Sequence, residues 1–245
     1  MKRLVLFLTL ACLLPAGLAS AERSQPGTQK QLSPAELKFR LAAGGVGFDS
    51  MAVLPNGKLY ATIGSQYIRA TLPSLDIDAG YPRPIKGGWG PLPASFNQGF
   101  DAMAVLPNGS LYVTKGNQYV KYADAAGTKI APGYPKPIKG NWGKLPESFN
   151  QGFDTMAVLP NGKLYVTKGG MYVKYNDATG DEVAPGYPKP IKGNWGKLPE
   201  SFNQGFDAME VFNDGLTYVT KGNWYLRYSD STAETVDAGY PKAIN

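Results

Sequence analysis

The sequence predicts an all-β protein, a four-bladed β-propeller, and two repeat spacings and a strand pattern support this prediction. The triplet Gly-Tyr-Pro recurs every 53 residues, beginning at Gly80, Gly133, Gly186 and Gly239. A Phe-Asp pair recurs at nearly the same spacing, with its aspartates at Asp49, Asp101, Asp154 and Asp207. Each repeat contains four short strand-like segments, and one small four-stranded sheet cannot bury both of its faces. Stacking four sheets around an axis buries them and closes the ring, so we expect repeats at about 47–98, 99–151, 152–204 and 205–245.

The second repeat shows how each unit is expected to fold. The segments 103–106, 111–114 and 119–122 are apolar, β-branched or alternating, and we predict them to be strands, with 129–131 as a short fourth strand. Asn108-Gly109 predicts a tight hairpin in which both residues have positive φ. The segment 145–149 is predicted to form one helical turn, with Pro146 at its first position.

The first residues are expected to be a targeting segment. Lys2 and Arg3 precede an apolar run at 4–14, which is too short to span a bilayer, and the small residues at 19–21 permit cleavage after Ala21. We therefore predict a signal peptide at 1–21 and a secreted protein, periplasmic or extracellular, without membrane insertion. Lipidation at Cys12 is an alternative, although the residues before it fit that signal poorly.

Residues 22–46 are expected to form a polar tail and a short N-terminal helix. The segment 33–36 (Ser-Pro-Ala-Glu) resembles a capping box with proline at the first helical position, and Leu37, Phe39 and Leu41 follow it. The fourth repeat lacks the Trp and Leu-Pro segment that the other repeats contain. We expect the helix to dock where that segment would lie and so to close the ring.

Composition excludes several kinds of chemistry. The 245 residues include no histidine, and the single cysteine is Cys12, so His-based triads, His-ligated zinc and His-ligated haem iron are excluded. Cleavage after Ala21 would lower the formal net charge from +6 to +4, because it removes Lys2 and Arg3. The other lysines recur along the repeats rather than on one face, which argues against a nucleic-acid partner. Acidic residues occupy mostly repeat positions and no nucleophile or phosphate-loop motif is present, so we expect no enzymatic activity.

A longer motif recurs within the repeats. In the second repeat it consists of Asp101-Ala102, the segments 111–116 (Leu-Tyr-Val-Thr-Lys-Gly) and 119–122 (Tyr-Val-Lys-Tyr), then Gly133-Tyr134-Pro135, Trp142 and Leu145-Pro146. This pattern resembles the hemopexin-like repeat, and the resemblance covers about residues 47–245. Repeats two, three and four match it well, whereas repeat one has Ile63 in place of the lysine and Ala70 in place of the last tyrosine. The resemblance implies a four-bladed propeller with a central channel.

The resemblance also implies a cation, calcium or sodium, held in that channel by main-chain carbonyl groups. In the family the innermost strand of each blade starts at the Asp of the Asp-Ala pair, and its carbonyls surround the channel. In this sequence the first ring of carbonyls would belong to Asp49, Asp101, Asp154 and Asp207, and the second to Met51, Met103, Met156 and Met209. Four carbonyl oxygens supply half of a coordination shell that water can complete. The alternative is that the aspartate side chains only cap turns or bridge blades.

Several binding functions remain open at this point. The resemblance implies a non-enzymatic module that binds a protein or a small cationic ligand such as a polyamine, as a monomer or homodimer, and a ring of aspartates would attract such a ligand. The alternative is a multivalent glycan binder with a shallow site on each blade, at Asn141-Trp142 and Asn150-Gln151. We favour a core position between blades for the tryptophans. Haem binding would need Tyr or Met as the iron ligand.

Overall fold

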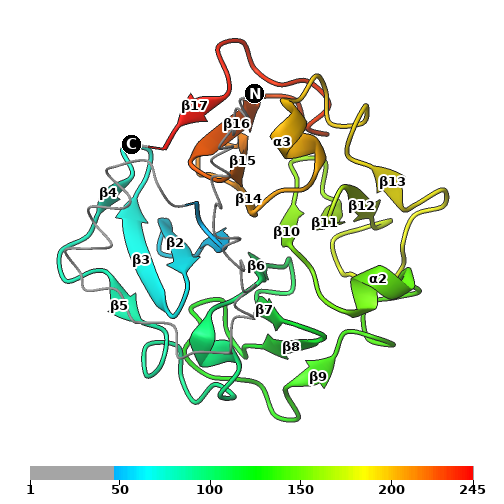
Figure 1. Cartoon of the computed structure of the whole chain (residues 1–245). Coiled ribbons are helices and arrows are strands. Elements are labelled where there is room, and N and C mark those ends of the chain that lie inside the picture. Colours follow the sequence, from blue (N-terminus) through cyan, green and yellow to red (C-terminus); the bar gives the residue numbers. More distant parts are fainter. Residues whose placement is uncertain (1–46, 245) are drawn as a thin grey trace, which may run out of the picture.

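The fold is a ring of four small antiparallel sheets, seen along its axis in Figure 1. The structure is a computed structural model that describes residues 47–244, so the expected signal peptide, tail and helix lie outside the described residues. Blade 1 contains β1 (Ser50–Val53), β2 (Lys58–Ile63), β3 (Gln66–Thr71), β4 (Asp76–Ile77) and β5 (Arg83–Pro84). Blade 2 contains β6 (Ala102–Val105), β7 (Leu111–Lys115), β8 (Gln118–Lys121) and β9 (Lys136–Pro137).

Blades 3 and 4 repeat the same order of strands. Blade 3 contains β10 (Thr155–Val158), β11 (Leu164–Lys168), β12 (Met171–Lys174) and β13 (Lys189–Pro190). Blade 4 contains β14 (Ala208–Val211), β15 (Thr217–Lys221), β16 (Trp224–Tyr228) and β17 (Lys242–Ala243). The inner strands β1, β6, β10 and β14 each contact the inner strands of both neighbouring blades, including β14 with β1. The ring is therefore closed, and the predicted all-β four-bladed propeller is confirmed.

The hairpin between the first two strands of a blade differs from the prediction. In blade 2 the N–H of Leu106 donates to the carbonyl of Ser110 at 3.0 Å, which leaves a three-residue loop at 107–109. Only Gly109 has positive φ, at 74°, so the expectation that Asn108 also has positive φ is wrong. Proline at the start of the loop favours a type I turn, and that turn needs a single left-handed residue to rejoin the ladder. The side chain of Asn108 stabilises the loop by accepting the N–H of Ser110 at 3.0 Å.

The fourth strand also lies later in the chain than predicted. The segment 129–131 makes only an isolated bridge, between Ile130 and Tyr122, and the fourth strand is β9, which pairs with β8. The same isolated bridge occurs in blade 4, between Val236 and Tyr228, where Ala238 stands in place of Pro132. The glycine that follows in both blades, Gly133 or Gly239, has positive φ and turns the chain away from the third strand, so the pairing stops there.

The predicted helical turn is present in two repeats, as α2 (Glu147–Asn150) and α3 (Glu200–Asn203). Pro146 is the N-cap of α2 and has an extended backbone, so the prediction that it occupies the first helical position is wrong by one residue. A shorter 3₁₀ turn, η1 (Phe96–Gln98), takes this place after blade 1. Within 47–244 no helix is long and apolar enough to cross a membrane.

The hydrophobic core consists of the contacts between neighbouring blades, which we call seams. Trp142, at the seam between blades 2 and 3, is 2% exposed. Its ring packs edge-on against Tyr112, Tyr119 and Phe153 at centroid distances of 5.6, 5.3 and 5.3 Å. The hydroxyl of Tyr175 donates to the Trp142 carbonyl at 2.9 Å. Trp89 and Trp195 have the same surroundings at their seams, so the predicted core position of the tryptophans is confirmed.

Candidate binding site at the channel mouth

The four aspartates of the Phe-Asp pairs come together at one end of the propeller axis. They line a hollow of about 490 Å³ together with three lysines, Lys115, Lys168 and Lys221. Each aspartate lies directly before an inner strand, and each lysine ends the second strand of its blade. Strand pairing places these two positions side by side at the same end of each sheet, so the four copies meet around the axis. We call this hollow the channel mouth.

In three blades the aspartate side chain holds its own blade together. The Oδ2 atom of Asp101 accepts the N–H of Gly116 at 2.6 Å, and its Oδ1 atom accepts the Lys115 ammonium at 2.7 Å. Asp154 and Asp207 make the same two contacts in blades 3 and 4. The side chains therefore cap the turn between the second and third strands, which is the alternative role considered above. The charge of each of these three carboxylates is balanced by an adjacent ammonium group.

Blade 1 breaks this symmetry. Asp49 accepts the N–H of Gly64 at 2.6 Å, but the lysine position of this blade holds Ile63. Burial raises the pKa of Asp49, the Gly64 N–H and Lys115 lower it, and the negative charges of Asp207 and Asp101 raise it further. The channel mouth thus contains four carboxylates and three ammonium groups. One carboxylate, that of Asp49, has no cationic partner in its own blade.

The main-chain carbonyls of the inner strands have an orientation that strand pairing determines. In blade 1 the N–H of Leu54 donates to the Lys58 carbonyl at 3.0 Å. The main-chain N–H and carbonyl groups of the even-numbered residues of β1 therefore point toward β2. Alternation in an antiparallel ladder turns the carbonyl of Met51 away from β2, toward the axis. The methionine side chains lie in the seam clusters instead. Within 47–244 no group of three or more Asp, Glu, His or Cys side chains is placed to hold a metal.

Glu210 is a residue that the sequence analysis missed. It occupies the position in β14 where the other inner strands have Ala52, Ala104 and Ala157. Its Oε1 atom accepts the N–H of Val211 at 2.8 Å. Burial raises the pKa of Glu210 to about 8, and the N–H groups of Val211 and Val53 lower it only in part. The comparison of the four repeats contained the signal, because three alanines and one glutamate share this position.

Replacing Glu210 by alanine is expected to raise the melting temperature at neutral pH. A half-buried carboxyl without a cationic partner among the described residues destabilises the fold by roughly 1–3 kcal/mol, and alanine is the residue that the other three blades have at this position. The expected rise is about 2–4 °C for each kcal/mol recovered. Thermal unfolding would be followed by circular dichroism with a chelator present. The matched variant Ala157→Glu should lower the melting temperature, and an unchanged or lower value for Glu210→Ala would contradict the argument.

The predicted glycan contacts are not available in the form expected. Trp142 is buried, and the Asn141 amide donates to the Pro137 carbonyl at 3.0 Å. Asn150 is also buried and donates to Glu147 at 3.3 Å. The prediction that a sugar stacks on the tryptophan of each blade is therefore wrong, because neighbouring side chains in the seams cover these aromatic rings. The exposed aromatic side chain is Trp224, at the start of β16, which is 45% exposed.

Sequence comparisons find relatives of limited length. No family model matches the chain. The chain is 32% identical over 131 residues to vitronectin from Oryctolagus cuniculus, a match covering 53% of this chain and 26% of the relative. It is 30% identical over 157 residues to matrix metalloproteinase-2 from Drosophila melanogaster, covering 63% of this chain and 19% of the relative. The matched region therefore spans about a quarter or less of these curated relatives.

Comparison with solved structures defines the class of fold. The hemopexin fold protein CP4 from cow pea has a TM-score of 0.66 at 21% identity, covering 80% of this chain and 93% of that one. The seed albumin LS24 from Lathyrus sativus gives 0.65 at 20%, with 81% and 92% covered. A plant lectin with two metal-binding sites from Cicer arietinum gives 0.63 at 20%, with 80% and 93% covered. The protein has the hemopexin fold. Its four repeats resemble the hemopexin-like repeat, and part of the chain is similar to vitronectin and to matrix metalloproteinase-2.

Proposed function

We propose that this protein is a secreted, non-enzymatic binding module that takes a cation or a small cationic ligand at the channel mouth. The observation that carries the proposal is the unequal ring of four carboxylates and three ammonium groups, in which Asp49 has no lysine of its own blade. A concave site with one uncompensated carboxylate focuses the field and favours a positively charged ligand. A polyamine, or a basic side chain of a protein partner, would meet the same carboxylate.

A calcium or sodium ion deeper in the channel is part of this proposal. Strand alternation turns the carbonyls of the inner-strand methionines, Met51, Met103, Met156 and Met209, away from the second strand of each blade. We propose that these carbonyls and those of Asp49, Asp101, Asp154 and Asp207, which line the channel mouth, are the ligands. Hard cations prefer oxygen ligands, and backbone carbonyls supply them without side-chain rearrangement. A solved structure of similar fold is described as a lectin with two metal-binding sites, which supports metal binding in this fold.

Calorimetric titration of the purified protein with calcium chloride and with spermine tests the proposal. The informative variant is Ile63→Lys, which gives Asp49 the ammonium partner that the other three blades possess. We expect spermine binding to weaken about tenfold at low salt, equivalent to about 1.4 kcal/mol. Ser110→Lys is the matched control, because it adds the same charge at the other end of β7, where blades 1 and 3 already have lysine. The proposal fails if neither ligand releases heat, or if Ile63→Lys and Ser110→Lys behave alike.

Glycan binding is the second candidate function. Two similar solved structures are described as a lectin and as an albumin showing hemagglutination. Strand pairing puts Trp224 directly opposite Lys221, so an exposed indole stands beside a lysine of the channel mouth. Such a ring could stack on a sugar face. A glycan array that gives no signal with the purified protein would remove this candidate.

A further inference from the structure

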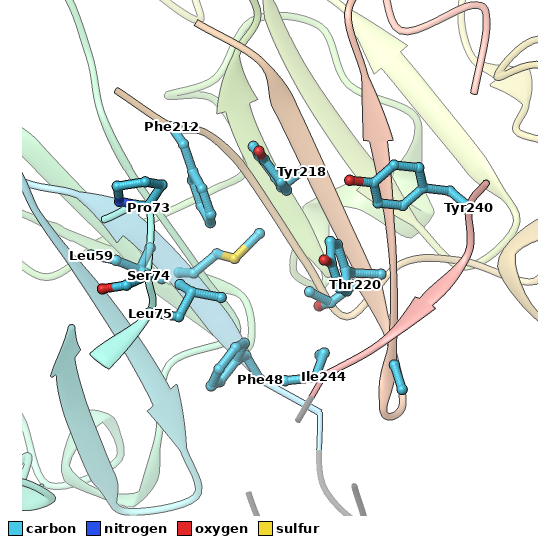
Figure 2. Close-up of a pocket in the computed structure, with 13 residues that line it drawn as sticks. Phe48, Leu59, Pro73, Ser74, Leu75, Phe212, Tyr218, Thr220, Tyr240 and Ile244 are labelled. Carbon is cyan, nitrogen blue, oxygen red and sulfur yellow. The ribbon is translucent and has the colours of Figure 1, made fainter. Parts of the chain in front are cut away.

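The seam between blades 4 and 1, here called the 4–1 seam, contains a largely apolar cavity at the place where a tryptophan lies in each of the other three seams. Figure 2 shows this cavity, which measures about 310 Å³. Its walls are Phe48, Leu59 and Leu75 from blade 1 and Phe212, Tyr218 and Tyr225 from blade 4. At each other seam a tryptophan fills the corresponding region. Within residues 47–244 no tryptophan enters the 4–1 seam.

The walls of the cavity reproduce a tryptophan site. At the seam between blades 1 and 2, Trp89 packs against Tyr60, Tyr67 and Phe100 at 5.7, 5.3 and 5.4 Å. The equivalent residues at the 4–1 seam are Tyr218, Tyr225 and Phe48. The two tyrosines of each pair are 6.2 Å apart in both places. The 4–1 seam therefore retains three walls of an aromatic site while lacking its occupant.

Leu75 indicates that the 4–1 cavity accepts a group other than a tryptophan side chain. The equivalent residue in blade 2 is Gly127, where a Cβ would lie 2.8 Å from the Trp89 ring. Leu75 has the same left-handed conformation, with φ of 60°, which is unfavourable for leucine. Its side chain lines the cavity (Figure 2). Leu75 is 39% exposed. Thr220 adds a buried hydroxyl that has no hydrogen-bond partner among the described residues. The cavity thus offers an apolar surface with one polar group.

The chain preceding blade 1 reaches this seam directly. Gly47 packs so closely on Gly222 of blade 4 that a Cβ there would overlap the Gly222 carbonyl, and Phe48 is itself a wall of the cavity. At the other seams the tryptophan lies eleven residues before the phenylalanine of the Phe-Asp pair, as Trp89 does before Phe100. Counting eleven residues back from Phe48 gives Leu37, with Phe39 and Leu41 next to it.

We propose that residues 32–44 of this chain dock in the 4–1 cavity and act as a latch between blade 1 and blade 4. Leu37 takes the place of the indole, and Phe39 or Leu41 covers Leu75 and Phe212. The latch supplies at this seam the apolar contacts that a tryptophan segment supplies at the other three. This inference is independent of the function proposed for the channel mouth, which lies on different residues.

Cysteine cross-linking in the full chain, with Cys12→Ser, tests the latch. One variant carries Arg40→Cys with Ser74→Cys at the rim of the cavity. The matched control carries Arg40→Cys with Ala126→Cys, the equivalent exposed position of blade 2 beside a seam that Trp89 fills. We expect the first pair to form an intramolecular disulfide at least about tenfold faster, because docking raises the effective concentration of the two thiols. Equal rates, or a disulfide between two molecules, would overturn the proposal.

Thermal unfolding gives a second, independent measurement. Phe39→Ser is expected to lower the melting temperature by about 5 °C, whereas the neighbouring Arg40→Ser should change it by less than about 1 °C. Adding Leu37→Ser to the cross-linking pair should also slow the disulfide toward the control rate. If Phe39→Ser and Arg40→Ser have the same melting temperature, the segment does not occupy the seam and the latch proposal is wrong.

Discussion

Replacing Trp142 by alanine is expected to lower the free energy of unfolding by about 3–5 kcal/mol. The side chain is 2% exposed and lies between blades 2 and 3, where three aromatic rings pack against it. Removing it leaves a large apolar cavity at a seam whose two sides belong to different sheets. Each sheet is held rigidly by its own hydrogen bonds, so neither side can collapse far into the space.

The matched control for this prediction is Trp224→Ala. Trp224 is 45% exposed at the start of β16, so its loss should change stability by less than about 0.5 kcal/mol. Urea unfolding followed by circular dichroism would measure both variants. Equal stabilities for Trp142→Ala and Trp224→Ala would show that the seams do not hold the ring together. If Trp142→Ala greatly lowers the free energy of unfolding and Trp224→Ala leaves it unchanged, the contacts in the seams stabilise the propeller.

The sequence was sufficient to predict the propeller because the repeat spacing and strand pattern determine how the sheets are arranged. A spacing of 53 residues and a pattern of strand-like segments leave few ways to bury both faces of each sheet. The same reasoning failed at two local points. The pairing at Ile130 is only a bridge and the fourth strand is β9, and in the hairpin of blade 2 only Gly109 is left-handed. Blade 4 has the same two local geometries with Ala238 and Asn213 in place of these prolines, Pro132 and Pro107. A glycine with positive φ is present at both points in both blades, and it decided the local geometry more strongly than the pattern of apolar residues.

The sites were less predictable, because their asymmetry depends on pairing between distant residues. The sequence analysis noted Ile63 as a departure from the repeat, but not that it leaves Asp49 without an ammonium partner. That consequence needs the contact between Asp101 and Lys115, fourteen residues apart, to be known. The main-chain carbonyl ligands predicted at the aspartates and methionines stay a prediction. The cavity at the 4–1 seam emerges only when four seams are compared in space.

Raising the pH above about 10 is expected to unfold the propeller cooperatively. Tyr122, Tyr175 and Tyr228 are fully buried, and each hydroxyl donates to the carbonyl of a seam tryptophan, at 2.8, 2.9 and 3.1 Å. Burial raises the pKa of all three far above the usual value of tyrosine, and it raises the pKa of Tyr67 to about 12. The phenols therefore stay protonated in the folded state after they would ionise in the unfolded chain.

The sign of the effect follows from this difference in bound protons. Below about pH 10 both states keep the three protons, so the tyrosines do not change the stability with pH. Above that value the unfolded chain releases them and the folded chain does not, so the free energy of unfolding falls. The slope is about 1.4 kcal/mol per tyrosine and pH unit, or roughly 4 kcal/mol per pH unit for three. Because a domain is typically stable by only about 5–15 kcal/mol, a rise of two pH units, which removes roughly 8 kcal/mol, takes away at least about half of that stability.

Tyrosinate absorbance and circular dichroism, recorded together against pH, test this expectation. The buried tyrosines should ionise at the same pH at which the β signal is lost, rather than near their usual pKa. Tyr175→Phe should reduce the slope of the unfolding free energy against pH by about one third, since it removes one of the three protons. If all 15 tyrosines ionised near pH 10 while the β signal persisted, their hydroxyls would have to be in contact with water. The hydrogen bonds that join each seam tryptophan to the next blade would then be absent, and the account of how the blades are held together would fail with them.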